Sequence, residues 1–216
     1  MKEAIYRLNS IADIRMGATL RGRDATRSVA SGSYHFLRIG DISPDGELST
    51  NELVRIEPHE SVKEGLFLQP GDVLFPNRGT RTTALVYRLN LPRTIVGAQF
   101  FIVRPDTGRL LPEYLAWFLR SEEAARYFEG RRKGTYVQII QRSDLAEMEI
   151  PVPALSVQQK IVEAVRLALR ERILAERLAS LKWKLAKCLL SKAAINHSEF
   201  SPRNEANEDH GTNPNQ

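Results

Sequence analysis

The chain has 216 residues, a hydrophobic share of 42%, a net charge of +5 and a sequence pI near 9.5. This length fits one domain with an appendage or at most two small domains, and the hydrophobic share excludes wholesale disorder. The positive charge favours an anionic partner: nucleic acid, a membrane surface or an acidic protein. The single cysteine, Cys188, excludes a disulfide framework and a multi-cysteine zinc site, and it favours a reducing compartment.

The first residues contain no apolar signal region. No apolar run approaches the roughly 20 residues that a helix needs to span a bilayer. We therefore expect a cytoplasmic protein that does not enter a membrane.

Residues 1–155 alternate short apolar runs with turn signals, which predicts a domain of mixed helices and strands. Runs rich in β-branched and aromatic residues predict strands at 71–75, 83–87 and 99–103. Segments rich in proline, aspartate and glycine predict turns at 43–46 and 69–72. Pro112 at a first helical position, followed by apolar residues at helical spacing, predicts a helix to about Phe128.

A long helix is expected after this domain. Pro151 and Pro153 end the domain, since neither fits a helix interior, and Ser156 is the expected N-cap. No proline or glycine follows until about Ala194, which allows a helix of roughly 58 Å. The predicted organisation is a domain at 1–155, a helix at 156–195 and a disordered polar tail at 196–216, an α+β fold class overall.

The helix carries an apolar seam with the alternating spacing of a heptad repeat. The seam consists of Leu174, Leu178, Leu181, Leu185 and Cys188. A helix this long cannot bury its stripe against one small domain, so it needs another helix of similar length. We expect that helix to come from another copy of the chain or from another protein.

Charge is segregated along the chain. The net charges are +4 for residues 2–38, −6 for 41–72, +5 for 78–109 and +6 for the long helix. These blocks favour surfaces for a charged partner, although a solvated face with chance clustering is the alternative.

Three basic loops combine arginine with glycine and with small polar or amide side chains. Arginine suits bidentate contact with guanine or phosphate, asparagine and glutamine suit adenine, and glycine lets backbone amides approach phosphates. These loops predict a DNA-binding surface. The candidate residues are Arg21 and Arg23; Asn77, Arg78, Thr80, Arg81 and Thr82; and Arg131, Arg132, Lys133, Thr135, Tyr136 and Gln138.

Signatures of catalysis are missing from the sequence. Residues 130–135 lack the spacing of a phosphate-binding P-loop, and no nucleophile elbow occurs. The four histidines have no metal-ligand spacing. Cys188 lies on the apolar seam, which favours packing over nucleophilic attack. The sequence predicts no catalytic site, metal site or cofactor.

Several segments together resemble one known family. They are Ile11–Ile14 with Gly17, Leu37–Ile42 with Gly46, Gly71–Leu74 with Arg78–Thr80, Pro112–Leu115 with Phe118 and Leu119, Gly134 and Thr135 with Val137, and Ile150–Val162. In order and spacing they resemble the specificity subunits of type I restriction-modification systems. One position departs from the family, which usually has an acidic residue where this chain has Val157.

The resemblance implies that residues 1–155 are a target-recognition domain, which reads one half of a bipartite site in double-stranded DNA. It implies that the helix is a spacer that pairs with a second spacer and docks modification (methyltransferase) subunits, with a restriction subunit as a possible further partner. Members of this family carry two domains and two spacers, so the chain resembles a half-length form. That form would act as a homodimer or beside a second half-subunit.

Two alternatives remain. The chain could be an interaction scaffold that does not bind DNA and captures or blocks methyltransferase subunits through the helix. It could also be a self-contained nuclease or methyltransferase, which needs a metal or cofactor site that the sequence does not reveal.

Overall fold

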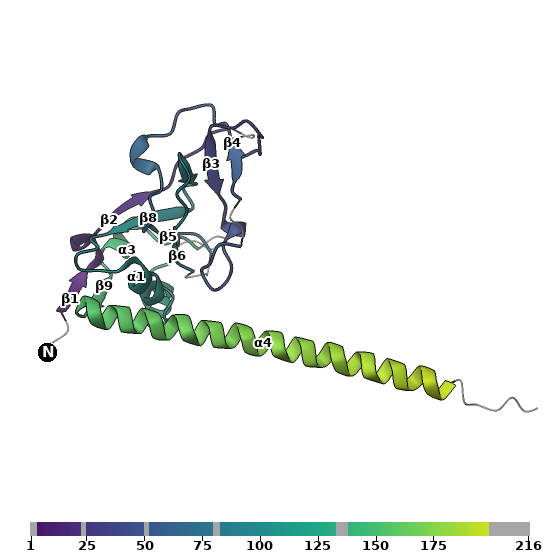
Figure 1. Ribbon diagram of the computed structural model, residues 1–216. Helices are drawn as coiled ribbons and strands as arrows, with labels where there is room; N and C mark the ends of the chain where they lie inside the picture. The colour runs from purple at the N-terminus through teal and green to yellow at the C-terminus, as the bar shows by residue number, and fades with distance from the viewer. Residues whose placement is uncertain (1–3, 23–24, 50–51, 80–82, 133–137, 199–216) are drawn as a thin grey trace, which may run out of the picture. The chain divides into compact units, whose positions relative to one another are not determined.

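The computed structural model describes residues 4–22, 25–49, 52–79, 83–132 and 138–198, with side chains described to residue 195. The chain divides into two compact units, Met1–Val165 and Arg166–Gln216. Each unit is described by itself. The architecture is α+β with a long C-terminal helix, as expected (Figure 1).

The centre of the first unit is a four-stranded antiparallel sheet (Figure 1). Its strands, in spatial order, are β2 (Ala12–Met16), β8 (Phe100–Pro105), β5 (Val73–Pro76) and β6 (Leu85–Val86). Strands β5 and β8 are nearly continuous apolar runs because both faces of this sheet are covered by hydrophobic clusters. The three expected strands are confirmed, with shifted ends.

Strand β5 begins two residues later than expected because a turn occupies the preceding residues. The amide of Asp72 donates to the carbonyl of Gln69 at 3.0 Å, and Gly71 has a φ of +97°, which favours glycine. The turn expected at 69–72 is thereby confirmed. The turn at 43–46 is also confirmed, since the amide of Gly46 donates to the carbonyl of Ser43 at 3.0 Å.

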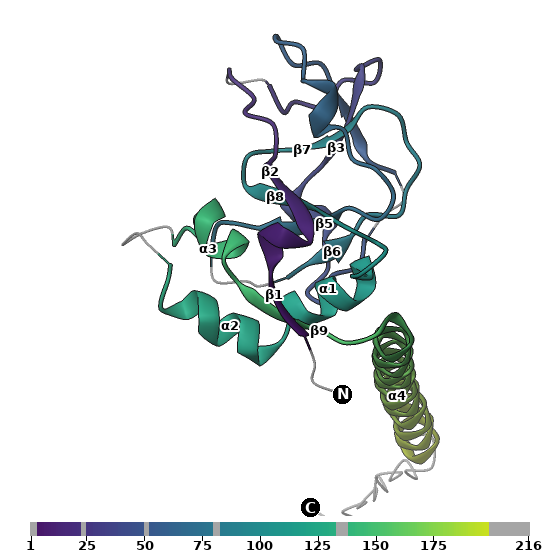
Figure 2. The same ribbon diagram turned by 90° about the vertical axis from the view of Figure 1, so that its left-hand side faces the viewer.

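The remaining strands of the described residues form two further sheets. A three-stranded sheet has the order β4 (Val54–Ile56), β3 (Tyr34–Leu37) and β7 (Thr94–Val96), with β3 and β7 parallel. Antiparallel strands β1 (Ala4–Arg7) and β9 (Glu149–Val152) form a separate pair, which brings the first and last strands of the unit together (Figure 2). Short 3₁₀ turns lie at Leu8–Ser10, Ile39–Asp41 and Glu64–Leu66.

The single helix expected from Pro112 to Phe128 is wrong, because the segment forms two helices. They are α1 (Pro112–Leu119) and α2 (Glu122–Glu129), and a short α3 (Arg142–Ala146) follows. Ser121 separates α1 from α2: its backbone is extended, and its hydroxyl accepts a hydrogen bond from the amide of Ala124 at 3.2 Å. A serine in this role caps a new helix and cannot continue the previous one.

The long helix α4 runs from Leu155 to Ser198. The N-cap expected at Ser156 is wrong, since the carbonyl of Ala154 already accepts the amides of Val157 and Gln158 at 2.8 and 3.1 Å. Ser156 therefore lies inside the first turn. The expected tail at 196–216 falls outside the described residues from 199 onward, and its first three residues continue the helix.

The first turns of α4 belong to the globular unit. Gln158 is fully buried, and its side chain accepts from the amide of Leu111 at 2.9 Å. It also donates to the carbonyls of Arg109 and Pro153 at 2.7 and 2.8 Å. These three hydrogen bonds hold the start of the helix against the loop before α1. The neighbouring Val157, which departs from the family pattern, is partly exposed.

Candidate nucleic-acid interface

Two of the three basic loops meet in the structure, although about 60 residues separate them along the chain. The amide of Gly79 donates to the carbonyl of Gln138, and the amide of Ile140 donates to the carbonyl of Asn77, both at 2.9 Å. Arg78 and Ile139 form the antiparallel bridge between these two bonds. We call residues 77–79 and 138–140 the paired ribbon.

The paired ribbon is anchored to the central sheet through Asn77, which is 3% exposed and directly follows β5. Its amide donates to the carbonyl of Gln99 at 2.9 Å, and its side-chain Nδ2 donates to the carbonyl of Ala98 at 2.8 Å. On the opposite strand, Ile140 is buried in the large core. Asn77 is therefore a support of the ribbon, whereas the sequence suggested that it contacts DNA directly.

The side-chain oxygen of Asn77 is buried and has no hydrogen-bond partner among the described residues. A buried polar atom without a partner costs about 1–3 kcal/mol, and such atoms are few in native structures. The ribbon therefore holds an uncompensated polar group at its base.

Arg78 and Arg132 differ in what they contact. Arg78 is exposed, and no carboxylate pairs with it among the residues that the structure describes. Arg132 is half-buried and donates to the carbonyl of Gly79, which ties its loop to the other strand of the ribbon. Burial lowers the pKa of Arg132, while the charge of Glu129 raises it. Gly79 has a φ of +84°, a conformation that turns the chain after Arg78 and favours glycine.

The region beside the ribbon is a hollow of about 550 Å³ along α2. It is lined by Glu122, Ala125, Arg126, Glu129, Arg132 and Gln138. Gln138 therefore faces α2, on the side of the ribbon opposite to Ile139, because successive side chains of an extended strand alternate. Arg131 is exposed, lies 3.8 Å from the ring centroid of Tyr127 and donates to the carbonyl of that residue at 3.1 Å.

Arg21, from the first basic loop, is not part of the ribbon. It lines a second hollow of about 490 Å³ together with His59 and Lys63, and none of its lining residues belongs to the ribbon. The guanidinium of Arg21 lies 3.7 Å from the carboxylate of Glu60, and both side chains are exposed. The remaining candidates, Arg23, Thr80, Arg81, Thr82, Lys133, Thr135 and Tyr136, lie outside the described residues.

Several arginines of the basic block at 78–109 have partners within the domain, and one of them pairs with the acidic block at 41–72. Arg104, from a basic block, makes two hydrogen bonds of 2.7 and 2.8 Å with the buried carboxylate of Asp72, from the acidic block. The paired carboxylate raises the pKa of Arg104. Other basic side chains of the block at 78–109 also have partners. Arg88 pairs with Glu113, Arg109 with Asp106, and Arg93 lies over Tyr34.

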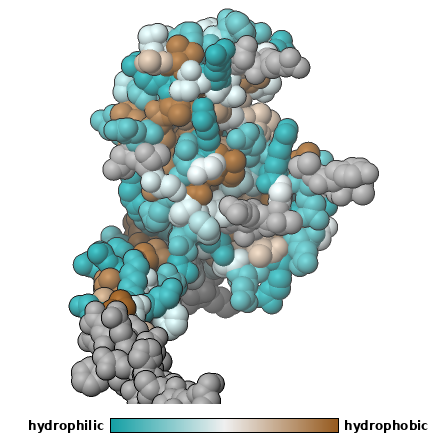
Figure 3. All heavy atoms as spheres, turned by 90° about the vertical axis from the view of Figure 1, so that its right-hand side faces the viewer, coloured by the Kyte–Doolittle hydropathy of each residue, from teal (hydrophilic) through white to brown (hydrophobic). Residues whose placement is uncertain are grey.

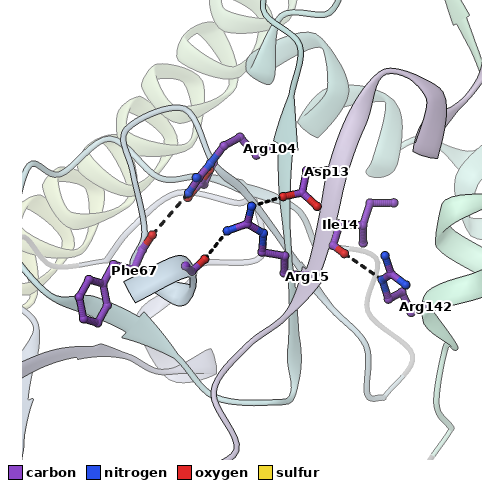
Figure 4. A network of polar contacts seen from close by, with 8 residues as sticks. Asp13, Ile14, Arg15, Phe67, Arg104 and Arg142 are labelled. Carbon is purple, nitrogen blue, oxygen red and sulfur yellow. Dashed lines mark hydrogen bonds and ion pairs between the residues drawn. The ribbon is translucent and has the colours of Figure 1, made fainter. Parts of the chain in front are cut away.

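Further arginines hold backbone carbonyls. Arg15 donates to the carbonyl of Gly65 at 2.5 Å and pairs with Asp13, and Arg142 donates to the carbonyl of Ile14 at 2.8 Å (Figure 4). Arg120 donates to the carbonyls of Asp45 and Ala84. Sequence reasoning missed these structural arginines, and a polar residue inside an apolar run, as at Arg104, was the one available signal. Net charge along the sequence therefore overstates the free positive charge of this domain.

One face of the molecule is predominantly hydrophilic, with hydrophobic side chains in separate spots (Figure 3). Among the described residues, no group of three or more histidine, cysteine, aspartate or glutamate side chains could hold a metal ion. In the same part of the chain, no helix is long and apolar enough to cross a membrane.

Comparison with solved structures defines the class of this fold. A structure described as the basis of complex assembly and conformational transition of the type I restriction-modification system matches 88% of this chain with a TM-score of 0.63 and 24% identity. The HsdS subunit of Thermoanaerobacter tengcongensis matches 78% with a TM-score of 0.54 and 23% identity. The type I S subunit of M. genitalium matches 77% with a TM-score of 0.51 and 15% identity. The fold is that of type I specificity subunits.

Sequence comparison adds a curated relative. The chain is 28% identical over 102 residues to the specificity subunit of the type I restriction enzyme HindI of Haemophilus influenzae. This match covers 45% of the chain and 22% of that relative, and the chain covers 45%, 37% and 38% of the three solved chains. No family model matches. The resemblance to type I specificity subunits inferred from the motifs is confirmed.

Proposed function

We propose that this chain is a DNA sequence-recognition module of a type I restriction-modification complex, and that its globular unit reads one half of a bipartite site. One observation carries the proposal: two basic loops, distant in sequence, form a ribbon that is anchored to the central sheet and presents the exposed Arg78. The likeness to specificity subunits supports the same assignment.

The long helix is proposed to pair with a second spacer helix and to dock methyltransferase subunits. The leucine side chains of its seam are all exposed in the isolated chain, from 53% at Leu181 to 60% at Leu185. Exposed leucines in a row are costly in water and mark an interaction surface. A homodimer, or pairing with a second half-subunit, would cover them. Partner subunits would then supply methylation and cleavage, while this chain selects the site and stays in the cytoplasm.

Salt dependence of DNA binding tests the proposal. The full chain is titrated against a pool of random duplexes between about 50 and 200 mM salt, where each phosphate contact contributes about 0.9 to the slope of log K against log salt. We expect a slope that reports several contacts. Arg78→Ala should weaken binding, whereas the charge-matched control Arg109→Ala should not, because Arg109 pairs with Asp106.

Each result separates this proposal from its alternatives. Absence of salt-sensitive binding, alone and with methyltransferase subunits, would favour the scaffold that acts only through the helix. Equal effects of the two arginine substitutions would show that the ribbon is not the contact surface. Cleavage or methylation of DNA by the purified chain alone would contradict the expectation that it has no catalytic site.

A further inference from the structure

The paired ribbon brings an arginine and an isoleucine together on one exposed face. Arg78 and Ile139 are bridge partners, and the hydrogen bonds on either side of them run between their neighbours. They therefore form a non-hydrogen-bonded antiparallel pair, whose Cα atoms lie about 4.5 Å apart and whose side chains share one face. Ile139 is 40% exposed, and Arg78 is exposed as well.

The geometry points to Arg78 and Ile139 as a two-residue reader of the DNA major groove, in which Ile139 contacts the methyl group of thymine beside a guanine bound by Arg78. This inference rests on the proposed function and names the base chemistry that the site takes. The major groove, about 12 Å wide, admits a two-stranded ribbon. In that groove, guanine presents two acceptors to an arginine fork, and thymine presents an apolar methyl group.

The spacing of the two side chains matches the spacing of bases. Cross-strand side chains begin about 4.5–5.5 Å apart, and successive base pairs are separated by about 3.4 Å. Arg78 and Ile139 can therefore reach the same base step or adjacent steps. An arginine alone could serve a phosphate, but an exposed isoleucine beside it gains nothing from phosphate and gains contact area from a methyl group.

The pair is held on a rigid support, as sequence reading requires. Below it, Asn77 makes two hydrogen bonds to the segment before β8, and Ile140 is 1% exposed in the core. Beside it, Arg132 holds the carbonyl of Gly79. The backbone under the two side chains cannot shift to another position without breaking these bonds, so both side chains start from fixed points above the same bases.

The test replaces thymine with uracil, which pairs identically and lacks only the methyl group. Duplexes bound by the full chain are selected from a random pool and resynthesised with one uracil at a time. At one thymine, we expect uracil to weaken binding of the wild type about fourfold, the factor for one buried methyl group. Ile139→Ala should bind the thymine duplex about as weakly and should no longer distinguish uracil there.

Two variants complete the experiment. Ile39→Ala removes another exposed isoleucine, 43% exposed in a different segment, and should keep the uracil effect. Arg78→Lys should lose the preference for one guanine within a step or two of the same thymine, because lysine lacks the planar fork.

The outcomes are distinct. An Ile139→Ala variant that still senses uracil at every thymine, or a wild type that senses none, overturns this inference while salt-dependent binding still supports the proposed function. Absence of any duplex binding overturns both.

Discussion

The two units of this chain use the same kinds of residue in opposite ways. In the globular unit, one carboxylate is buried and paired, in the bidentate contact of Arg104 with Asp72, and apolar side chains fill the core. In the helical unit, Leu174, Leu181 and Leu185 are more than half exposed. The domain is therefore stabilised by contacts among its own residues, whereas the seam of the helix would be buried only against a partner. Substitutions in the two units should change different measurements.

The chain contains a natural reporter in each unit. Of its two tryptophans, Trp117 lies in α1 beside Tyr114, and Trp183 lies on the helix with 64% exposure. In the variant Trp183→Phe, the remaining Trp117 reports unfolding of the domain. In the variant Trp117→Phe, the remaining Trp183 reports changes at the helix.

The largest expected effect is in the domain. Asp72→Ala should lower the free energy of unfolding by about 3 kcal/mol, because it leaves the guanidinium of Arg104 without its partner and removes the acceptor for the amide of Gln69. Urea unfolding of the domain measures the change. Arg109→Ala, which breaks an exposed pair with Asp106, should cost less than about 1 kcal/mol. Equal losses would contradict the contrast between internal and surface pairs.

The second effect is at the start of α4. Gln158→Ala should cost about 2 kcal/mol, because the amide of Leu111 and the carbonyls of Arg109 and Pro153 lose their partner. The adjacent Gln159 is exposed, so Gln159→Ala is the matched control. Thermal unfolding followed by Trp117 distinguishes the two variants. An unchanged transition for Gln158→Ala would show that the helix start is not held by these bonds.

The third effect should appear in association alone. Leu181→Asp should weaken self-association at least about tenfold, since burial of a leucine contributes about 1.5–3 kcal/mol. The unfolding midpoint of the domain should stay the same. Light scattering across micromolar concentrations measures this, with Ser180→Asp as the control. A wild-type chain that stays monomeric without any partner would overturn the homodimer form of the proposal.

The smallest effect is a pH dependence in the domain. Hydrogen bonds from the side chain and the amide of Ser33 lower the pKa of Glu57 below its ordinary value of 4.5. A lowered pKa in the folded state means that the stabilisation is present at higher pH and is lost as pH falls below 4.5 through the folded value. Glu57→Gln should flatten this part of the pH profile of stability. Parallel profiles for wild type and Glu57→Gln would refute the assignment.

The motifs that carry the resemblance to type I specificity subunits serve the fold more than the site. In the segment Gly71–Leu74, glycine forms the turn and Asp72 forms a buried ion pair. Gly17 lies where a Cβ atom would overlap the carbonyl of Gly97. Gln158 fastens the helix to the domain. These positions are recognisable in sequence because backbone geometry and burial restrict them to one or two residue types.

The site was predictable only in part. Composition indicated the second and third basic loops, and both contribute to the ribbon. It did not indicate that Asn77 is a buried support or that Arg132 binds a carbonyl of the other loop. Ile139 carried no signal, because the sequence does not tell which of the adjacent Ile139 and Ile140 is buried until the bridge partner is known.

By itself, the sequence determined the fold class, three strands of the central sheet, two turns and the existence of a long helix, because hydrophobic periodicity and proline or glycine positions act locally. It also determined that the helix carries an apolar seam, since such a seam is a property of consecutive turns. Only the tertiary structure decided which arginines are free. Pairing between Arg104 and Asp72, or between the strands of the ribbon, joins residues that are far apart in the chain and whose contacts no local pattern encodes.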